Sequence, residues 1–148
     1  MSKAISASEI AGITGMKITD EQIDIVEAGL TPAVVIAGAG SGKTETMATR
    51  VLWLVANGYA KPEEILGLTF TRKAAGELKQ RIKRRLRQLR SEGKIEGTFS
   101  LEVPVMTYHS YAGNILSEYG LRLGIDTDSE LIGEATVWQQ AAQILRNW

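Results

Sequence analysis

The sequence has no cysteine, a single histidine and no long apolar run. Without cysteine it can form neither disulfides nor thiolate metal sites, which favours an intracellular compartment. No stretch approaches the roughly 18 consecutive apolar residues of a membrane span, and the first dozen residues lack the apolar core of a signal peptide. His109 has no cysteine or second histidine with which to share a metal ion. These absences predict a cytoplasmic protein with no membrane contact.

The composition is that of a folded chain with an uneven charge distribution. Hydrophobic residues make up 44% of the 148 residues, which excludes a disordered class. The length predicts one domain with a second only begun. The net charge is zero, but nine of the 17 Lys and Arg residues lie between residues 72 and 90, where Glu77 is the only acid. This basic strip is either a solvated helix face or a nucleic-acid contact.

The most informative stretch runs from Ala33 to Thr44, AVVIAGAGSGKT. Val34, Val35 and Ile36 predict a strand buried on both faces. The glycines that follow let consecutive backbone N–H groups turn inward, and a helix that begins near Gly42 adds the positive end of its dipole. The stretch therefore predicts a phosphate-binding loop, formed by Gly38, Ala39, Gly40, Ser41, Gly42, Lys43 and Thr44. The alternative is an ordinary glycine-rich turn between a strand and a helix.

Two residues of this loop carry specific chemistry. Lys43 is expected to reach the β- and γ-phosphates of a nucleotide as a point charge, and the Thr44 hydroxyl to bind a magnesium ion. Gln22 lies earlier, three residues after Thr19, in the pattern of a helix capping box. Its amide also has a donor and an acceptor that match the edge of adenine, so a structural and a functional interpretation both stand.

The remaining pattern predicts alternating helices and strands. Helices are expected over residues 6–15, 19–29, 42–56, 72–90, 108–119 and 134–148, and further strands over 65–70 and 103–107. The 42–56 helix is expected to bury Met47, Val51, Leu54 and Val55. The connection between the first two strands has the length of a crossover, so these strands are predicted to be parallel.

Four stretches, at residues 19–22, 37–44, 68–75 and 106–110, resemble the Q motif and motifs I, Ia and Ib of superfamily 1A helicases, the UvrD, Rep and PcrA family. The resemblance covers residues 18–117. The lead-in at 6–15 and the Gly-Lys-Thr-Glu-Thr-Met continuation look more like the actinobacterial UvrD-like branch that includes the AdnB helicase-nuclease subunit.

The resemblance implies a fold and a division into domains. The expected fold is α/β, a P-loop NTPase (RecA-like) parallel sheet with flanking helices, incomplete in this chain. Residues 1–117 are then the N-terminal part of RecA-like domain 1A, and residues 118–148 begin the helical insertion 1B.

The resemblance also implies an ATP-dependent DNA helicase that moves on single-stranded DNA and unwinds duplex, 3′ to 5′, in repair or recombination. ATP and Mg²⁺ are the implied cofactors, and Gln22 is implied to read adenine. A nuclease or helicase partner subunit stays unknown. The implied contacts with single-stranded DNA are Thr69, Phe70, Thr71, Arg72, Lys73, Thr107, Tyr108, His109 and Ser110.

The chemistry of these side chains is compatible with that role. Hydroxyl and cationic groups suit phosphates, and Phe70 offers a flat face for a base. Taken alone, Phe70 and Tyr108 also have a core interpretation, as aromatic residues that close strands. Arg84, Arg85 and Arg87 are expected to be outer residues, further along the helix from the loop that follows the strand. They should give nonspecific attraction or solubility rather than form the DNA path.

The sequence departs from the family pattern in ways that affect catalysis. Glu45 follows Thr44 where many members have an arginine near the nucleotide base, and Arg72 stands where Asn is common. No apolar run ends in paired acids, and the only adjacent Asp-Glu pair, Asp20-Glu21, precedes the loop. We therefore expect nucleotide binding through Lys43 without efficient hydrolysis.

Two other classes of function remain as alternatives. A small P-loop kinase would need a cluster of lid arginines and a sheet completed within the chain, and the sequence supplies neither. A nucleic-acid or protein-binding module with a vestigial phosphate loop is the second alternative. The intact Lys43 and Thr44 argue against it, and nucleotide titration decides.

Overall fold

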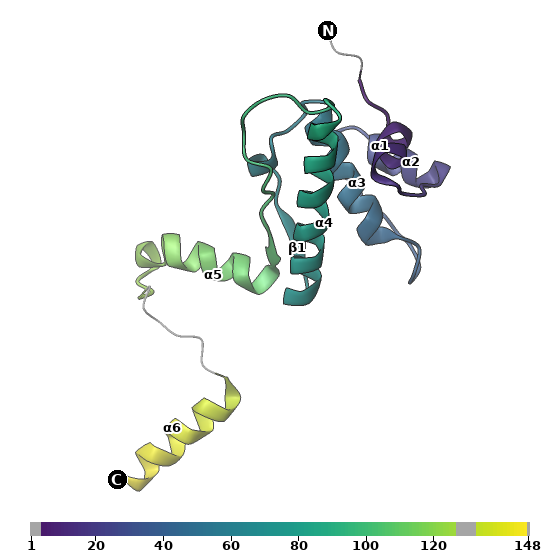
Figure 1. Cartoon of the computed structure of the whole chain (residues 1–148). Coiled ribbons are helices and arrows are strands. Elements are labelled where there is room, and N and C mark those ends of the chain that lie inside the picture. The colour runs from purple at the N-terminus through teal and green to yellow at the C-terminus, as the bar shows by residue number, and fades with distance from the viewer. Residues whose placement is uncertain (1–3, 127–132, 148) are drawn as a thin grey trace. The chain divides into compact units, whose positions relative to one another are not determined.

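A computed structural model describes residues 4–126 and 133–147 of the chain (Figure 1). The chain forms two compact units, Met1–Tyr108 and His109–Trp148, and each is described by itself below. Within the described residues, no helix combines the length and apolarity needed to cross a lipid bilayer.

The first unit begins with two short helices, and the second of them has the predicted capping box. Helix α1 (Ala7–Thr14) starts at Ser6, whose hydroxyl accepts from the Glu9 N–H, and it ends at Gly15 in the left-handed region, φ 68°. Helix α2 (Asp20–Glu27) starts at Thr19 with the predicted capping box. It ends two residues before the predicted terminator Gly29, with Ala28 already extended.

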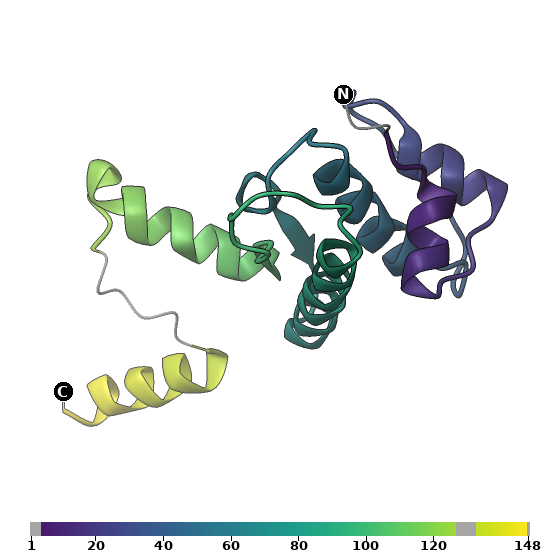
Figure 2. The ribbon, with the colours of Figure 1, turned by 45° about the horizontal axis from the view of Figure 1, so that its top comes forward.

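Helices α3 (Lys43–Ala56) and α4 (Arg72–Ser91) form the centre of this unit and lie side by side (Figures 1 and 2). Helix α4 buries the stripe that its periodicity predicts: Ala75, Leu78, Ile82, Leu86 and Leu89. The four larger side chains, from Leu78 to Leu89, pack with Ile10 of α1 and Leu52 of α3 in one apolar core. The core therefore fixes α1, α3 and α4 relative to one another.

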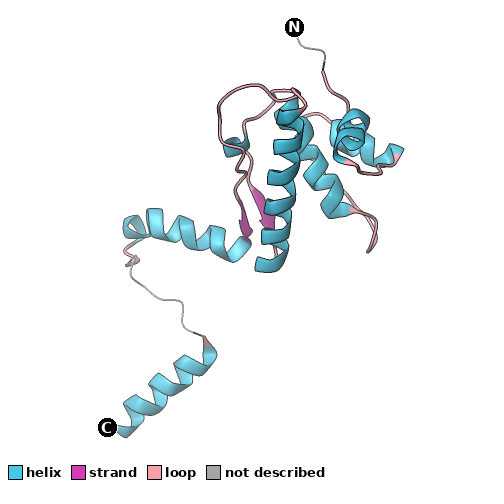
Figure 3. Ribbon diagram, in the orientation of Figure 1, coloured by secondary structure: helices cyan, strands magenta, loops and turns pink. Residues whose placement is uncertain are grey.

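A small parallel sheet packs against α4 (Figure 3). Strand β1 (Gly67–Thr69) follows the 3₁₀ turn η1 (Pro62–Glu64), and strand β2 (Val105–Thr107) follows the loop after α4. The register places Gly67 opposite Val105. A Cβ atom on Gly67 would lie 3.2 Å from Val105 Cγ2, so a residue without a side chain suits this close pairing. The βαβ order confirms the α/β class in outline.

The predicted strand at Val34, Val35 and Ile36 is wrong. These residues form no strand, and the exposed fractions of Val34 and Ile36 are 89% and 94%. A strand needs a neighbour that accepts its backbone hydrogen bonds and a surface that covers its side chains. Among the described residues the two strands, β1 and β2, pair with each other, so the run has no partner. The predicted parallel pairing of this run with residues 65–70 is wrong for the same reason.

The predicted buried face of α3 is also wrong in part. Val55 is buried, but Met47 is exposed and Val51 and Leu54 are half-buried. The buried positions are instead Thr46, Ala48, Thr49 and Leu52, with Val55. Helix α3 packs against α1, α2 and α4 together, so small and polar residues are buried on a face that apolarity alone does not indicate.

The second unit contains the predicted helices of the C-terminal part. Helix α5 (Tyr108–Tyr119) leads into the 3₁₀ turn η2 (Gly120–Leu123), and helix α6 (Glu134–Arg146) follows. The helical period predicts an apolar stripe on α6 formed by Val137, Ala141, Ile144 and Trp148. Val137 and Ile144 are exposed, and Trp148 lies outside the described residues. The domain boundary near residue 117 stays a prediction.

Candidate nucleotide and DNA sites

The predicted phosphate loop connects to α3 through a backbone that only glycine adopts easily. Gly40 and Gly42 have φ of 79° and 82°, and Gly42 is the N-cap of α3. Helices α1, α2 and α4 each begin with a side chain that caps their N–H groups, whereas α3 has no such cap. The first N–H groups of α3 therefore have no side-chain acceptor, at the positive end of the helix dipole.

The side chains of the loop fold back onto its own carbonyl groups. The Lys43 ammonium donates to the carbonyl oxygens of Ala37, at 3.0 Å, and of Gly38, at 2.5 Å. The Ser41 hydroxyl donates to the same Gly38 oxygen at 2.9 Å. All of these contacts are exposed to solvent, so a phosphate that competes for the Lys43 ammonium has direct access. Thr44 is exposed in the first turn of α3.

Gln22 contacts the loop directly. Its side-chain Nε2 donates to the Ser41 carbonyl oxygen at 3.0 Å, while its Oε1 accepts from the Thr19 N–H at 3.1 Å. A Cβ atom on Gly42 would lie 2.9 Å from Gln22 Nε2, so a glycine leaves room for this amide. The structural role of Gln22 in the capping box is confirmed. Its predicted contact with adenine stays a prediction.

Asp20 and Glu21, next to Gln22, lie in the first turn of α2, as predicted. A hydrogen bond from the Thr19 side chain holds the pKa of Glu21 below its ordinary value of 4.5. Asp20 and Glu21 therefore belong to a helix N-terminus, where carboxylates are favourable.

Arg50 is a positioning residue that the sequence pattern did not single out. Its guanidinium donates to the carbonyl oxygens at the end of α2: Ile25 at 3.1 Å, Val26 at 2.9 Å, Ala28 at 2.8 Å and Gly29 at 2.8 Å. The carbonyl groups at a helix end have no N–H donor within the helix, so the Arg50 guanidinium supplies donors to them. Arg50 thus ties α2, which carries Gln22, to α3, which follows the phosphate loop. An arginine within a helix gives no signal of such a contact.

Glu45, the departure from the family pattern, binds two arginines of α4. Its carboxylate accepts from Arg81 Nη1 at 2.6 Å and forms a second ion pair with Arg85. Arg85 is therefore not an outer residue, as the sequence suggested, because it is buried, with 8% of its surface exposed. Arg85 lies between the buried residues Ile82 and Leu89 along α4, on the inner side of the helix.

The predicted DNA segments meet where β1 and β2 end. Phe70 follows β1, and Tyr108 follows β2. Their rings lie 5.3 Å apart between centroids, tilted by 43°. Phe70 is 87% exposed and Tyr108 is 49% exposed, so the core interpretation is wrong for Phe70. Two flat apolar rings thus present faces to solvent at one edge of the sheet.

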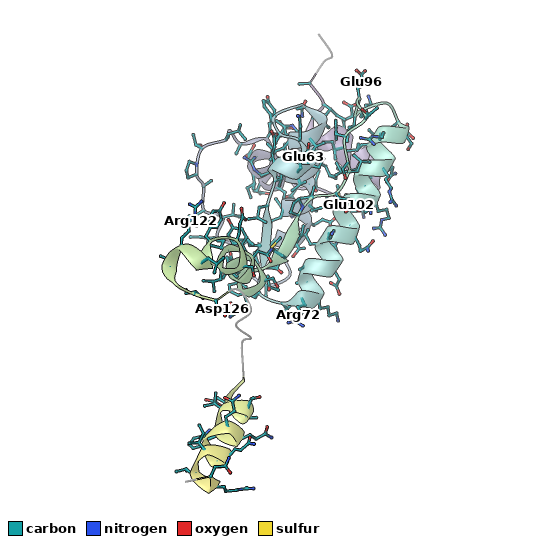
Figure 4. All side chains as sticks on the ribbon, turned by 90° about the vertical axis from the view of Figure 1, so that its left-hand side faces the viewer. Glu63, Arg72, Glu96, Glu102, Arg122 and Asp126 are labelled. Atoms are coloured by element: carbon teal, nitrogen blue, oxygen red, sulfur yellow. The ribbon has the colours of Figure 1, made fainter. Side chains whose placement is uncertain are left out.

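The polar residues of the first DNA segment surround the start of α4. The Thr71 hydroxyl accepts from the Ala74 N–H at 3.1 Å and caps α4, while the Thr69 hydroxyl donates to the Thr71 carbonyl at 3.1 Å. Arg72 and Lys73 are exposed in the first turn, and Figure 4 shows Arg72 at this end of the helix. The threonines are thus engaged in local structure, and the two cations face solvent.

The second DNA segment is less uniform. Thr107 is buried, with 7% of its surface exposed, whereas Tyr108 is half-exposed. His109 and Ser110 are exposed in the first turn of α5, within the second unit. The structure therefore brings Thr69 to Lys73 together with Tyr108, and it gives Thr107 no exposed position.

The sequence profile of the UvrD/REP helicase N-terminal domain matches residues 18–147. The chain belongs to this family. The predicted resemblance to superfamily 1A helicases is thereby confirmed. The match begins at the start of the Q-motif helix and includes the phosphate loop, both strands and α6.

Individual UvrD/REP family members show the same relationship. The chain is 36% identical to ATP-dependent DNA helicase UvrD2 of Mycobacterium tuberculosis over 115 residues, 78% of this chain and 16% of the relative. It is 31% identical to DNA helicase II of Escherichia coli over 115 residues, 78% of this chain and 15% of that protein. Identity to the PcrA helicase of Staphylococcus aureus is 30% over 127 residues, 86% of this chain and 16% of that protein.

The chain thus spans about 15–16% of the length of these UvrD/REP relatives. Their names describe DNA helicases, and a helicase N-terminal region is what this chain matches.

Proposed function

We propose that this chain forms the nucleotide-binding and strand-contacting part of an ATP-dependent DNA helicase. The observation that carries the proposal is the start of α3, where Gly42 leaves the helix N–H groups without a side-chain cap directly after a glycine-rich loop. Such a helix end accepts an anion at little conformational cost, because no capping side chain has to be displaced from its N–H groups. Family membership supports ATP as the nucleotide whose phosphates are this anion.

The residues present fit a magnesium nucleotide. The backbone from Gly38 to Thr44 holds the phosphates, Lys43 exchanges its two carbonyl acceptors for phosphate oxygens, and the exposed Thr44 hydroxyl binds Mg²⁺. Gln22 already touches the loop through Ser41, and its second amide hydrogen remains for a base. When bound, magnesium-ATP supplies the phosphoryl chemistry that drives a motor.

The strand-contacting surface, which we propose binds single-stranded DNA, is the edge of the sheet at which β1 and β2 end. Phe70 and Tyr108 form a platform on which bases stack, and Arg72 and Lys73 beside it neutralise phosphates. Thr69 and Thr71 hold the turn that presents Phe70. His109 and Ser110 keep their predicted role as DNA contacts, whereas the buried Thr107 acts by placing Tyr108.

Hydrolysis requires groups that this sequence does not provide. The sequence has no apolar strand that ends in paired acids, so nothing orients a water or offsets the charge that develops on the γ-phosphate. We propose that the 148 residues bind nucleotide and single-stranded DNA without efficient turnover. Unwinding from 3′ to 5′, a role in repair or recombination, a cytoplasmic location and a nuclease partner belong to the proposal for the whole protein.

Nucleotide binding is tested by the thermal and denaturant stability of the chain with magnesium-ADP. At a concentration about 100 times the dissociation constant, a ligand that binds only the native state adds about 2.7 kcal/mol to the free energy of unfolding. Lys43→Ala should remove most of this gain. Lys94→Ala is the matched control, because Lys94 pairs with Glu9 and lies near Asn57 and Gly58, beyond the other end of α3.

The outcomes separate the proposal from its alternative. Stabilisation that Lys43→Ala removes and Lys94→Ala preserves supports a working phosphate loop. No stabilisation in the unsubstituted chain, with DNA binding intact, would instead identify a nucleic-acid-binding module with a vestigial loop. Robust turnover that disappears in Lys43→Ala would show that catalytic groups exist which the sequence analysis missed.

A further inference from the structure

Three charged side chains connect the first turn of α3 with the middle of α4. The Glu45 carboxylate receives Arg81 Nη1 at 2.6 Å through one oxygen and Arg85 Nη2 through the other. Glu45 lies two residues after Lys43, so this contact is made by the same helical turn that follows the phosphate loop. The two ion pairs use both oxygens of one carboxylate, which fixes its orientation more firmly than a single pair does.

The cluster is partly shielded from water and carries an excess of positive charge. The side chain of Arg85 is 10% exposed, and those of Glu45 and Arg81 are 30% and 32% exposed. Two guanidinium groups face one carboxylate, and Arg85 Nη1 is buried without a hydrogen-bond partner in the described structure. Because Arg85 depends on Glu45 for compensation, a displacement of the Glu45 carboxylate is resisted strongly.

Helix α4 carries this constraint to the strand-contacting surface. Its N-cap is Thr71, and its first two residues are Arg72 and Lys73, which follow Phe70 directly. Arg81 and Arg85 lie further along the same continuous helix. A rigid helix that is held at its middle by the phosphate-loop helix cannot shift at its start without moving Glu45.

We propose that Glu45 is a positioning residue that couples occupancy of the phosphate loop to the placement of the DNA-contacting end of α4. This inference rests on the proposed function, since it needs a nucleotide at Lys43 and a DNA strand at Phe70. A phosphate that draws the start of α3 toward itself moves Glu45, and the two arginines transmit the movement to α4. Linkage then requires that each ligand change the affinity of the other by the same factor.

Two other ion pairs, one of α4 and one just after it, do not reach the first turn of α3. Lys83 pairs with Glu102 in the segment before β2, and Figure 4 shows Glu102 beside α4. Lys94, after the end of α4, pairs with Glu9 of α1 at 2.7 Å. Neither pair involves the turn that follows the phosphate loop. Glu102→Gln therefore removes the same charge from a contact of the same helix and serves as the matched control for Glu45→Gln.

The test measures the dissociation constant of magnesium-ADP with and without saturating oligothymidylate. In the unsubstituted chain we expect DNA to change this constant by about 5-fold or more, as allosteric couplings commonly do. Glu45→Gln should bring the ratio close to one while each ligand alone still binds. Glu102→Gln should leave the ratio unchanged. A purely structural role of Glu45 would instead weaken both ligands alone and keep the ratio.

A second variant keeps the inference testable if Glu45→Gln does not fold. Arg81→Gln leaves a balanced Glu45–Arg85 pair and removes a side chain that is 32% exposed, so folding should survive. It should lower the ratio, and Arg81→Gln combined with Glu45→Gln should lower it no further than Glu45→Gln alone. An unchanged ratio in folded Arg81→Gln or Glu45→Gln overturns the inference.

The result also distinguishes this inference from the proposed function. If the unsubstituted chain binds both ligands independently, the proposed function stands and the coupling by Glu45 is refuted. If it binds no nucleotide, both fail together.

Discussion

Removal of the Phe70 ring should separate DNA binding from folding. Phe70 is 87% exposed, so Phe70→Ala takes away little surface that folding buries. The native contact that it loses is the tilted ring pair with Tyr108 at 5.3 Å. Such pairs contribute about 0.5–1.5 kcal/mol, and the exposure of both rings favours the lower end. The free energy of unfolding should therefore change only slightly.

Binding should change far more. Stacking of one base on an aromatic side chain contributes about 1–3 kcal/mol, which corresponds to a roughly 5- to 140-fold weaker dissociation constant. Fluorescence anisotropy with labelled oligothymidylate measures this constant, and urea unfolding measures the stability. The slope of log affinity against log salt should stay nearly constant, because no phosphate contact is removed.

Tyr59→Ala is the matched control. Tyr59 is also an exposed aromatic residue, with 53% of its surface accessible, and it pairs with Trp53 at 4.9 Å between ring centroids. It follows α3, away from the ends of β1 and β2. Equal affinity of folded Phe70→Ala and the unsubstituted chain would refute the stacking platform. If Arg84→Ala or Arg87→Ala then abolished binding, the basic face of α4 would be the DNA site instead.

Three further predictions concern charge and packing. Arg72→Ala should reduce the slope of log affinity against log salt by about 0.7, the value for one single-strand phosphate, in the same anisotropy titration. Lys83→Met should raise the pKa of Glu102, which the Lys83 hydrogen bond holds below its ordinary value of 4.5. In the unsubstituted chain this carboxylate contributes stability that is lost as pH falls below 4.5, and carboxyl NMR titration follows both effects. Leu52→Ala should lower the free energy of unfolding by about 2–5 kcal/mol, measured in urea, because Leu52 is fully buried.

The sequence was informative where a structure depends on neighbours along the chain. The capping box at Thr19 is local, and it was predicted. The apolar stripe of α4 was predicted as well, because its five buried apolar residues recur with the helical period over about four turns. The family, too, could be predicted, since its motifs are short and ordered along the chain.

The prediction failed where distant partners decide. The run Val34 to Ile36 is apolar enough for a central strand, but a strand forms only beside another strand. Arg85 was expected to give nonspecific attraction or solubility because it lies far along the helix from the loop that follows β1, whereas Glu45, forty residues earlier, supplies the counter-charge that permits its burial. Glu45 itself was noted only as an exception to a pattern. The spacing of residues along the chain reveals neither the missing partner of the Val34 to Ile36 run nor the ion pair between Glu45 and Arg85.

The contact of Arg50 with the end of α2 has a consequence for the exposed apolar run. Arg50 fixes Ala28 and Gly29 to α3 at 2.8 Å, and Gly42 joins α3 covalently. Both ends of the segment between residues 29 and 42 are therefore anchored on one helix. The chain entropy lost on closing this loop is already spent in folding α2 against α3. Conversion of Val34 to Ile36 into a strand beside a new neighbour would then require only local ordering, and the core built on Leu52 would stay as it is.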